Sequence, residues 1–286
     1  SDYEVVLPKL TNEQLDYELV QSTEDWPRTL FVTVASEDPN PADPDSADPD
    51  SADTAEEGAS GAEGSGDSAE GGDASPADPA AFPSIAMVLR QESPHDNYLV
   101  TRLFSLRGGI SMPPAAPAEE GTALLADDMQ SLVLPPGQVG EVYAKVLAGD
   151  TANEQAELFD LTDDPIIAKS GAAWVAAAQQ AAADGGTDVE YTVSAAQSDS
   201  PIVSLSTGVG GALVTTTVLE TRVEKQTGTY QPKAVGAFAA LSGLSGRQSS
   251  MVSTVAHQLL FFVPSGKSGE EIQLLGYTTE LVEATN

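Results

Sequence analysis

Residues 135–149 read PPGQVGEVYAKVLAG, which is a helical pattern, and residues 189–193 read VEYTV, which is a strand pattern. The chain therefore changes from helix to strand between residues 135 and 193. The apolar side chains of the first segment recur at the spacing of one helical face, a set made up of Val139, Val142, Tyr143, Val146 and Leu147. The two prolines suit the start of a helix and Gly149 suits its end. In the second segment three apolar residues alternate with polar ones, which is the period of a half-buried strand.

Two further helices are expected between these segments. A short one spans Asn153–Phe159. A longer one begins after an N-cap at Asp163 or Asp164, carries Trp174 as an anchor, and ends at Gly185.

Long strand patterns then continue to the end of the chain. They lie near Ile202–Ser206, Ala212–Glu224, Val252–Val263 and Ile272–Thr278. Helices followed by a meander of strands predict an α+β domain over residues 134–286, in which about three helices pack on one face of an antiparallel sheet.

Residues 1–133 predict a smaller, mostly-β region, which is an incomplete first domain. Its expected strands lie near Glu4–Pro8, Arg28–Ala35, Ser84–Gln91 and Tyr98–Arg107. Between the second and third of these, residues 36–81 hold 14 carboxylates and no basic residue. This run lacks aromatic and aliphatic β-branched side chains, so it is expected to be a disordered acidic loop between two strands of one sheet.

The charge and the cysteine count exclude several classes of function. The net charge is −32, with 12 basic residues against 44 acidic ones, so nucleic acids and anionic lipid headgroups would be repelled. The absence of cysteine removes disulfides, thiol nucleophiles and thiolate metal sites. No apolar run is long enough to span a bilayer. Because the chain starts at Ser1 without an initiator Met, we expect an upstream segment that carries any membrane anchor.

Short pieces spread over the chain resemble an actinobacterial family of extracytoplasmic, membrane-anchored proteins of unknown function, built from nuclear-transport-factor-like (cystatin-like) domains. The pieces are Trp26-Pro-Arg28, Gln91-Glu-Ser-Pro94 with Tyr98, Gly109 and Pro113, Leu134-Pro-Pro136 with Tyr143-Ala144, Gly210-Gly-Ala-Leu-Val214, and Val263-Pro264 to Leu275-Gly276 with Leu281-Val-Glu-Ala-Thr285. The resemblance implies a cone-shaped fold and a location at the cell envelope. It supplies no catalytic residues, and the acidic run departs from the family's pattern.

Motifs for phosphate and metal binding fail on spacing. Gly266-Lys-Ser268 ends like a phosphate-binding loop, but Phe261 stands where that loop needs glycine, so a hairpin turn is expected. Gly208–Gly211 precedes a strand and is expected to be a turn as well. The aspartates of the acidic run lack the calcium-loop spacing. His95 is expected in a turn between two strands. The chain has two histidines in all, so a three-histidine metal site is impossible, and neither a metal nor a cofactor is expected.

One pair of residue types carries catalytic potential. His257 lies in mid-strand, and we interpret it as a hydrogen-bonded core histidine or as a general base paired with Glu220 or Glu224 of the neighbouring strand. Tyr143 and Trp174 either form plain core or line a ligand pocket together with His257.

The leading hypothesis is a non-catalytic extracytoplasmic domain of a bacterial cell-envelope protein that binds a protein or small-molecule partner. It does not bind nucleic acid, and it meets a membrane only through the upstream anchor. The alternative is an isomerase or hydrolase with the fold of a cone, using His257 and a carboxylate. A third possibility is a structural subunit whose edge strands pair with a partner.

Overall fold

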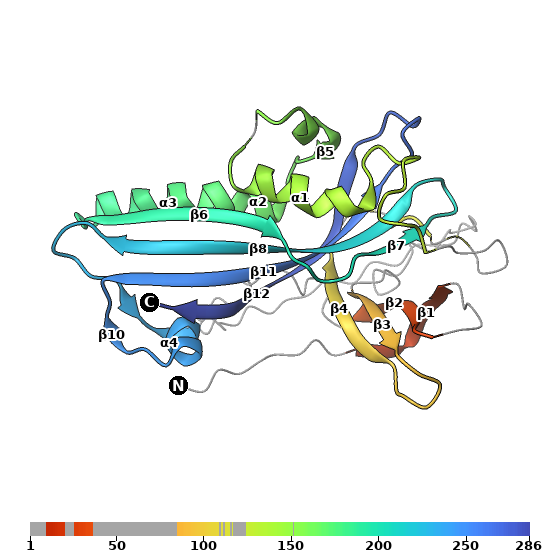
Figure 1. Cartoon of the computed structure of the whole chain (residues 1–286), viewed down its shortest axis with the longest axis horizontal. Coiled ribbons are helices and arrows are strands. Elements are labelled where there is room, and N and C mark those ends of the chain that lie inside the picture. The colour runs from red at the N-terminus through yellow and green to blue at the C-terminus, as the bar shows by residue number, and fades with distance from the viewer. Residues whose placement is uncertain are drawn as a thin grey trace, which may run out of the picture.

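Segments in which apolar and polar side chains alternate form the strands of a ten-stranded sheet, the largest element of the fold (Figure 1). The long neighbouring strands are antiparallel. The computed structural model describes residues 10–20, 26–36, 85–108, 110, 112–114, 116, 124–150 and 152–286, the first of these ranges as backbone. The strands follow the order β1-β2-β3-β4-β12-β11-β8-β6, while β5 pairs with β12 and β7 with β8. Helices lie against this sheet, which confirms the predicted α+β class.

The C-terminal strands agree with their predicted positions. They are β6 (Val189–Gln197), β7 (Val203–Ser206), β8 (Ala212–Gln226), β11 (Ser250–Val263) and β12 (Ile272–Thr285). β8 and β11 pair without interruption from Ser250↔Lys225 to Val263↔Ala212. Two irregularities interrupt the pairing of β11 with β12. The antiparallel order expected after residue 186 is therefore present.

The N-terminal strands form the other end of the sheet. They are β1 (Leu10–Val20), β2 (Arg28–Ser36), β3 (Ile85–Gln91) and β4 (Leu99–Leu106). The last three match predicted strands, whereas β1 was not predicted. The strand expected near residues 4–8 and nearly all of the acidic run, residues 37–81, lie outside the described residues.

A narrow seam joins the two ends of the sheet. Only Gly276↔Leu106 and Tyr277↔Ser105 pair β12 with β4. Phe31, Ala86, Val88 and Phe104 pack beneath this seam on Leu205, Leu213, Leu260 and Leu275. The division into domains at residues 133 and 134 stays a prediction.

Three helices and one 3-10 turn cover the face of the C-terminal strands. They are α1 (Pro136–Leu147), η4 (Glu154–Leu158), α2 (Pro165–Lys169) and α3 (Gly171–Asp184), and η4 leads into the short β5 (Phe159–Asp160). The apolar face of α1 packs on aliphatic and aromatic side chains of β8, β11 and β12. The prediction of one continuous helix after Asp164 was wrong, because Ser170 adopts an extended conformation and separates α2 from α3.

A short excursion between β8 and β11 was also missed. It contains β9 (Lys233–Ala234), α4 (Gly236–Ser242) and β10 (Gly246–Arg247), of which β9 and β10 pair with each other. No side chain of α4 is buried. This helix contacts β12 with residues that are at most half-buried, and the 3.6-residue apolar period that would have predicted it is missing.

Candidate functional site

The candidate histidine and its carboxylate come from the two central strands. His257 of β11 lies opposite Val218 of β8, and Glu220 follows two residues later on the same face of β8. Alternation along both strands turns these side chains toward the helices. The sheet register thus brings together two residues that are 37 positions apart.

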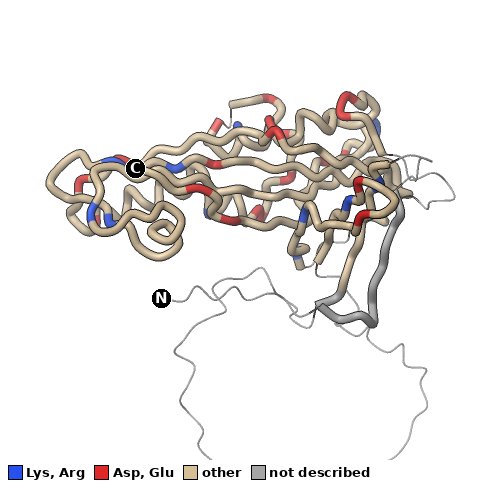
Figure 2. Tube along the Cα trace, turned by 60° about the horizontal axis from the view of Figure 1, so that its bottom comes forward, with Lys and Arg blue, Asp and Glu red and all other residues tan. Residues whose placement is uncertain are grey.

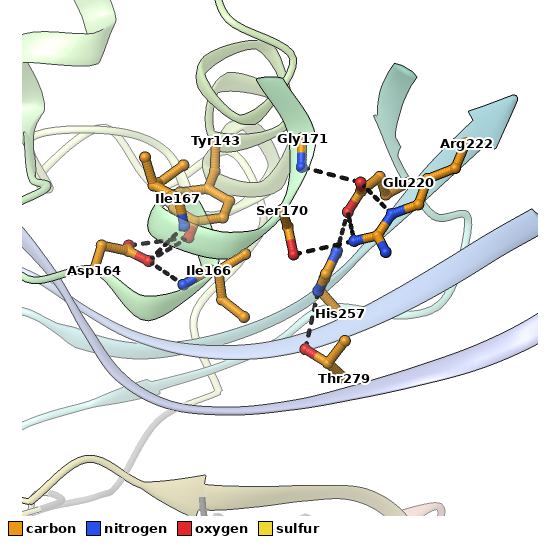
Figure 3. Close-up of polar contacts among 10 residues, drawn as sticks. All are labelled: Tyr143, Asp164, Ile166, Ile167, Ser170, Gly171, Glu220, Arg222, His257 and Thr279. Carbon is orange, nitrogen blue, oxygen red and sulfur yellow. Dashed lines mark hydrogen bonds and ion pairs between the residues drawn. The ribbon is translucent and has the colours of Figure 1, made fainter. Parts of the chain in front are cut away.

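His257 and Glu220 form a direct hydrogen bond in the protein interior (Figure 3). Nε2 of His257 lies 2.7 Å from Oε2 of Glu220, and the exposed fraction of both side chains is 0%. An ionised carboxylate can only accept, so Nε2 carries the hydrogen. Nδ1 of His257 lies 3.0 Å from Oγ1 of Thr279, an exposed residue of β12. Both ring nitrogens therefore have partners within the fold.

Glu220 also caps the N-terminus of helix α3. The backbone N–H of Gly171, the first residue of α3, donates to Oε1 of Glu220 at 3.0 Å. Ser170 at the N-cap position makes no side-chain capping bond. A carboxylate at a helix N-terminus is stabilised by the unpaired N–H groups and by the helix dipole. Here a residue of the sheet provides the cap that the sequence next to the helix does not.

Gly171 allows this close approach. Its φ of +58° lies in the left-handed region, and a Cβ there would overlap the carbonyl oxygen of Leu147 near the end of α1. Glycine is the residue that adopts such a conformation without steric strain. The break between α2 and α3 is therefore fixed by tertiary contacts with α1 and β8.

Arg222 completes the network. Its Nε donates to Oε1 of Glu220 at 2.7 Å and its Nη2 donates to Oε2 at 3.2 Å, which is a bidentate ion pair. Nη2 also donates to the Ser170 hydroxyl at 3.3 Å, and the guanidinium lies 4.9 Å from the ring centre of Trp174. Trp174 in turn makes an edge contact with Tyr191 of β6. This anchors α3 on the sheet through Trp174, as the sequence predicted.

These contacts decide the acidity of Glu220. Burial raises its pKa, but the hydrogen bonds from His257, Arg222 and Gly171 and the charge of Arg222 outweigh burial and lower the pKa to about 2. Glu220 is therefore ionised at neutral pH. Burial raises the pKa of Glu224, which the charge of Arg222 opposes. Glu224 lies opposite Met251, six residues along β11 from His257. Of the two predicted carboxylates, the structure thus brings Glu220 to the histidine.

A second buried polar pair holds helix α2. The hydroxyl of Tyr143 donates to both carboxylate oxygens of Asp164, at 3.1 and 2.9 Å. Oδ1 of Asp164 also accepts from the backbone N–H groups of Ile166 and Ile167, so Asp164 is the N-cap of α2. Burial raises the pKa of Asp164, and it raises the pKa of Tyr143 well above its usual value. This pair, too, is satisfied internally.

The three predicted pocket residues have different surroundings in the fold. Tyr143 is fully buried in contact with Phe159 and Phe261, with ring centres 5.8 and 5.1 Å away. Trp174 is half-buried between Arg222 and Tyr191. A hollow of about 410 Å³ in the described chain has a different lining, made up of Asp160, Phe262, Gly269, Glu270, Glu271 and Gln273. Whether the predicted residues bind a ligand stays a prediction.

The turns have the predicted positions. Gly208–Gly211 join β7 to β8, and the N–H of Thr207 donates to the carbonyl of Gly211. Gly266-Lys-Ser268 lies between β11 and β12, and His95 lies between β3 and β4. Within the described ranges, no three histidine, aspartate or glutamate side chains converge as a metal ion requires.

The sequence reasoning missed the residues that connect His257 and Glu220 to the helices. Arg222 and Ser170 were not singled out, and Gly171 was predicted to lie inside one continuous helix instead of at the start of α3. A signal for Arg222 exists in the alternation of β8, since Glu220, Arg222 and Glu224 share one face of an otherwise apolar and hydroxyl-rich strand. The Ser170-Gly171 dipeptide is a turn signal that could have indicated the break, but its contacts depend on the approach of α1 and β8.

Comparisons with known proteins give one match. A family model described as "Domain of unknown function (DUF8094)" matches residues 67–286. No curated protein matches the chain, and no solved structure does. Among the described residues, no helix combines the length and the apolar character of a membrane span.

Proposed function

Since the chain belongs to the domain-of-unknown-function family DUF8094, we propose that it is a non-catalytic, extracytoplasmic domain of a bacterial cell-envelope protein and that it binds a partner. The resemblance to an actinobacterial membrane-anchored family supports the location. The complete burial of the His257–Glu220 pair supports the non-catalytic role.

The burial of His257 and Glu220 is the observation on which this proposal depends. A general base must come within hydrogen-bond reach of a substrate proton, directly or through one water molecule. Both side chains have an exposed fraction of 0%, and their polar atoms bond to Arg222, Gly171 and Thr279. Tyr143, Phe159, Phe261 and aliphatic side chains fill the space between the helices and the sheet. The network therefore fits the task of fixing α3 to the sheet.

A protein partner suits the surface better than a small molecule. Small-molecule sites are concave and mostly apolar. The hollow beside β12 has one apolar residue, Phe262, against three carboxylates, Gln273 and Gly269. Carboxylates are spread along the described chain as a whole (Figure 2). Such a surface favours a partner with basic residues at the contact, through electrostatic steering.

The location is tested by labelling a single cysteine. The sequence has no cysteine, so Val209→Cys, at a turn position with an exposed fraction of 65%, introduces a defined thiol. We expect a membrane-impermeant maleimide to label this variant of the full-length protein in intact cells of the native bacterium. The unsubstituted protein controls for thiols elsewhere in the full-length protein. Labelling that appears only after lysis would contradict the extracytoplasmic location.

The 2.7 Å contact between His257 and Glu220 favours one alternative, an enzyme of the isomerase or hydrolase type. A His257→Gln allele separates the two functions, because glutamine can still donate to Glu220 but is a poor general base. We expect a strain with this allele to resemble the wild type as long as the variant accumulates in folded form. A folded variant at wild-type abundance that behaves like a gene deletion would support the enzyme.

A further inference from the structure

β1 and β6, the strands at the two ends of the sheet order, differ in how they are protected against pairing. β1 carries three acidic residues, Glu13, Asp16 and Glu18, and its pairing with β2 is irregular. β6 carries one, Glu190, and pairs with β8 over nine residues without a bulge. β6 contains neither lysine nor proline. Charges, prolines and bulges are the usual means by which edge strands avoid pairing. Of these protective features, β6 has only the charge of Glu190.

The backbone of β6 shows which groups point away from the sheet. The N–H of Ser198 donates to the carbonyl of Thr217, and the N–H of Thr227 donates to the carbonyl of Asp188. Hydrogen-bonded and non-hydrogen-bonded pairs alternate in an antiparallel ladder. The even-numbered residues of β6 therefore bond to β8, and the odd-numbered ones turn their N–H and C=O groups outward. Among the described residues, no backbone group pairs with this outer side.

Helix α3 lies beside the same edge (Figure 1). It has no charged side chain over residues 171–183, although much of it is exposed. Its exposed residues are Ala172, Ala176, Ala177, Gln179, Gln180, Ala181, Ala183 and Asp184. In a chain with a net charge of −32, two copies repel each other over most of their surfaces. The edge formed by β6 and α3 is a place where this repulsion is weak.

We propose that the chain forms a homodimer in which β6 pairs antiparallel with β6 of a second copy, joining the two sheets into one. The register centred on Val193 pairs all nine residues of the strand. In this register Tyr191 faces Ala195 of the second copy, and Thr192 faces Ser194. Glu190 faces Ala196, so no carboxylates oppose each other in the strand. Two-fold pairing of one surface with itself is the commonest oligomer geometry. A dyad perpendicular to the sheet keeps both α3 helices on the same face, where alanines permit close packing.

The proposal is independent of the proposed partner-binding function, and the register gives it a specific test. Thr192 and Ser194 are exposed, and their pair is of the non-hydrogen-bonded kind, in which side chains lie closest. The variant Thr192→Glu/Ser194→Glu places glutamates opposite each other twice per dimer. The variant Thr192→Lys/Ser194→Glu places lysine opposite glutamate twice. A Thr227→Glu/Thr229→Glu variant adds the same charge as the first pair at exposed positions outside β6.

Light scattering after size exclusion and sedimentation equilibrium measure the assembly. We expect the unsubstituted chain to show twice the 29.5 kDa of one copy. The glutamate pair should weaken dimerisation roughly tenfold, whereas the lysine–glutamate pair and the control outside β6 should dimerise like the parent. Val193→Pro removes an outward N–H while leaving the ladder with β8 intact, and it should abolish the dimer.

Three results would overturn the proposal. They are a monomeric mass at the highest soluble concentration, a dimer that Val193→Pro leaves unchanged, and equal dimerisation of the two charge variants. A folded far-ultraviolet circular dichroism spectrum and a cooperative melting transition of each variant distinguish lost pairing from lost folding. If the mass is monomeric, binding of a heterologous extended peptide at β6 would assign the edge to a different partner.

Discussion

Replacing Glu220 by glutamine tests the assigned role of the buried network. The substitution keeps the size of the side chain and removes its charge. Arg222 then loses its ion-pair partner, and the N-terminus of α3 loses a charged cap. If the network holds α3 on the sheet, the variant should be markedly less stable at neutral pH while it keeps the fold.

The magnitude follows from the acidity of Glu220. Its pKa falls from 4.5 to about 2 on folding, and each unit corresponds to about 1.4 kcal/mol, so the ionised carboxylate contributes about 3 kcal/mol to the free energy of unfolding. Because the pKa is lower in the folded state, this stabilisation is complete above pH 4.5 and is lost as the pH falls toward 2. For a domain of this size, about 3 kcal/mol corresponds to a decrease of roughly 6–12 °C in the melting temperature.

The assay compares urea unfolding of both proteins between pH 7 and pH 3. The other carboxylates titrate in both proteins, so their effect cancels in the difference between the two unfolding free energies. We expect this difference to be about 3 kcal/mol at pH 7 and to shrink below pH 4.5. Glu224→Gln is the matched control, because burial raises the pKa of Glu224 and its ionised form is disfavoured by folding. This control should be at least as stable as the parent at pH 7.

Two outcomes would refute the reasoning. A Glu220→Gln variant within about 1 kcal/mol of the parent at pH 7 would mean that the ion pair contributes no more than a surface pair. A difference that stays constant from pH 7 to pH 3 would show that the loss does not come from the charge.

Further predictions concern other parts of the fold. Gly171→Ala should lower the free energy of unfolding by at least about 2 kcal/mol, because of its positive φ and the overlap with Leu147, whereas Gly186→Ala, at a positive φ with open space, should lower it less in the same denaturation assay. Tyr143→Phe should lower it by about 1–2 kcal/mol, because the buried Asp164 loses a donor; equal stability in urea would contradict the role of the hydroxyl. Deleting residues 40–78 should leave the melting temperature nearly unchanged by calorimetry, and a decrease of many degrees would show that the acidic run contacts the folded part.

The parts of the fold that were predictable have strong periodicity. The apolar face of α1 and the alternation of β6 and β11 identify these elements without knowledge of their neighbours. The break at Ser170 was not predictable in this way. The local Ser170-Gly171 dipeptide is compatible with a turn, but the contacts that fix the break come from Leu147 and Glu220, which are distant in sequence.

The candidate site divides in a similar way. Alternation along adjacent strands predicts that His257 faces Glu220 or Glu224, and the register selects Glu220. Burial is not encoded in alternation, because it depends on how closely the helices approach the sheet. Arg222 was missed although it alternates with Glu220 and Glu224 along β8, because an arginine between two carboxylates on a strand is also typical of an exposed face.

The cap of α3 has a consequence for the order of events during synthesis. Gly171 leaves the ribosome 49 residues before Glu220, the side chain that completes its first turn. At about 5–20 residues per second, this interval lasts several seconds. During that time the alanine-rich segment has neither its cap nor the strand on which it lies, so it emerges as a fraying helix and matures only when the chain has reached β8.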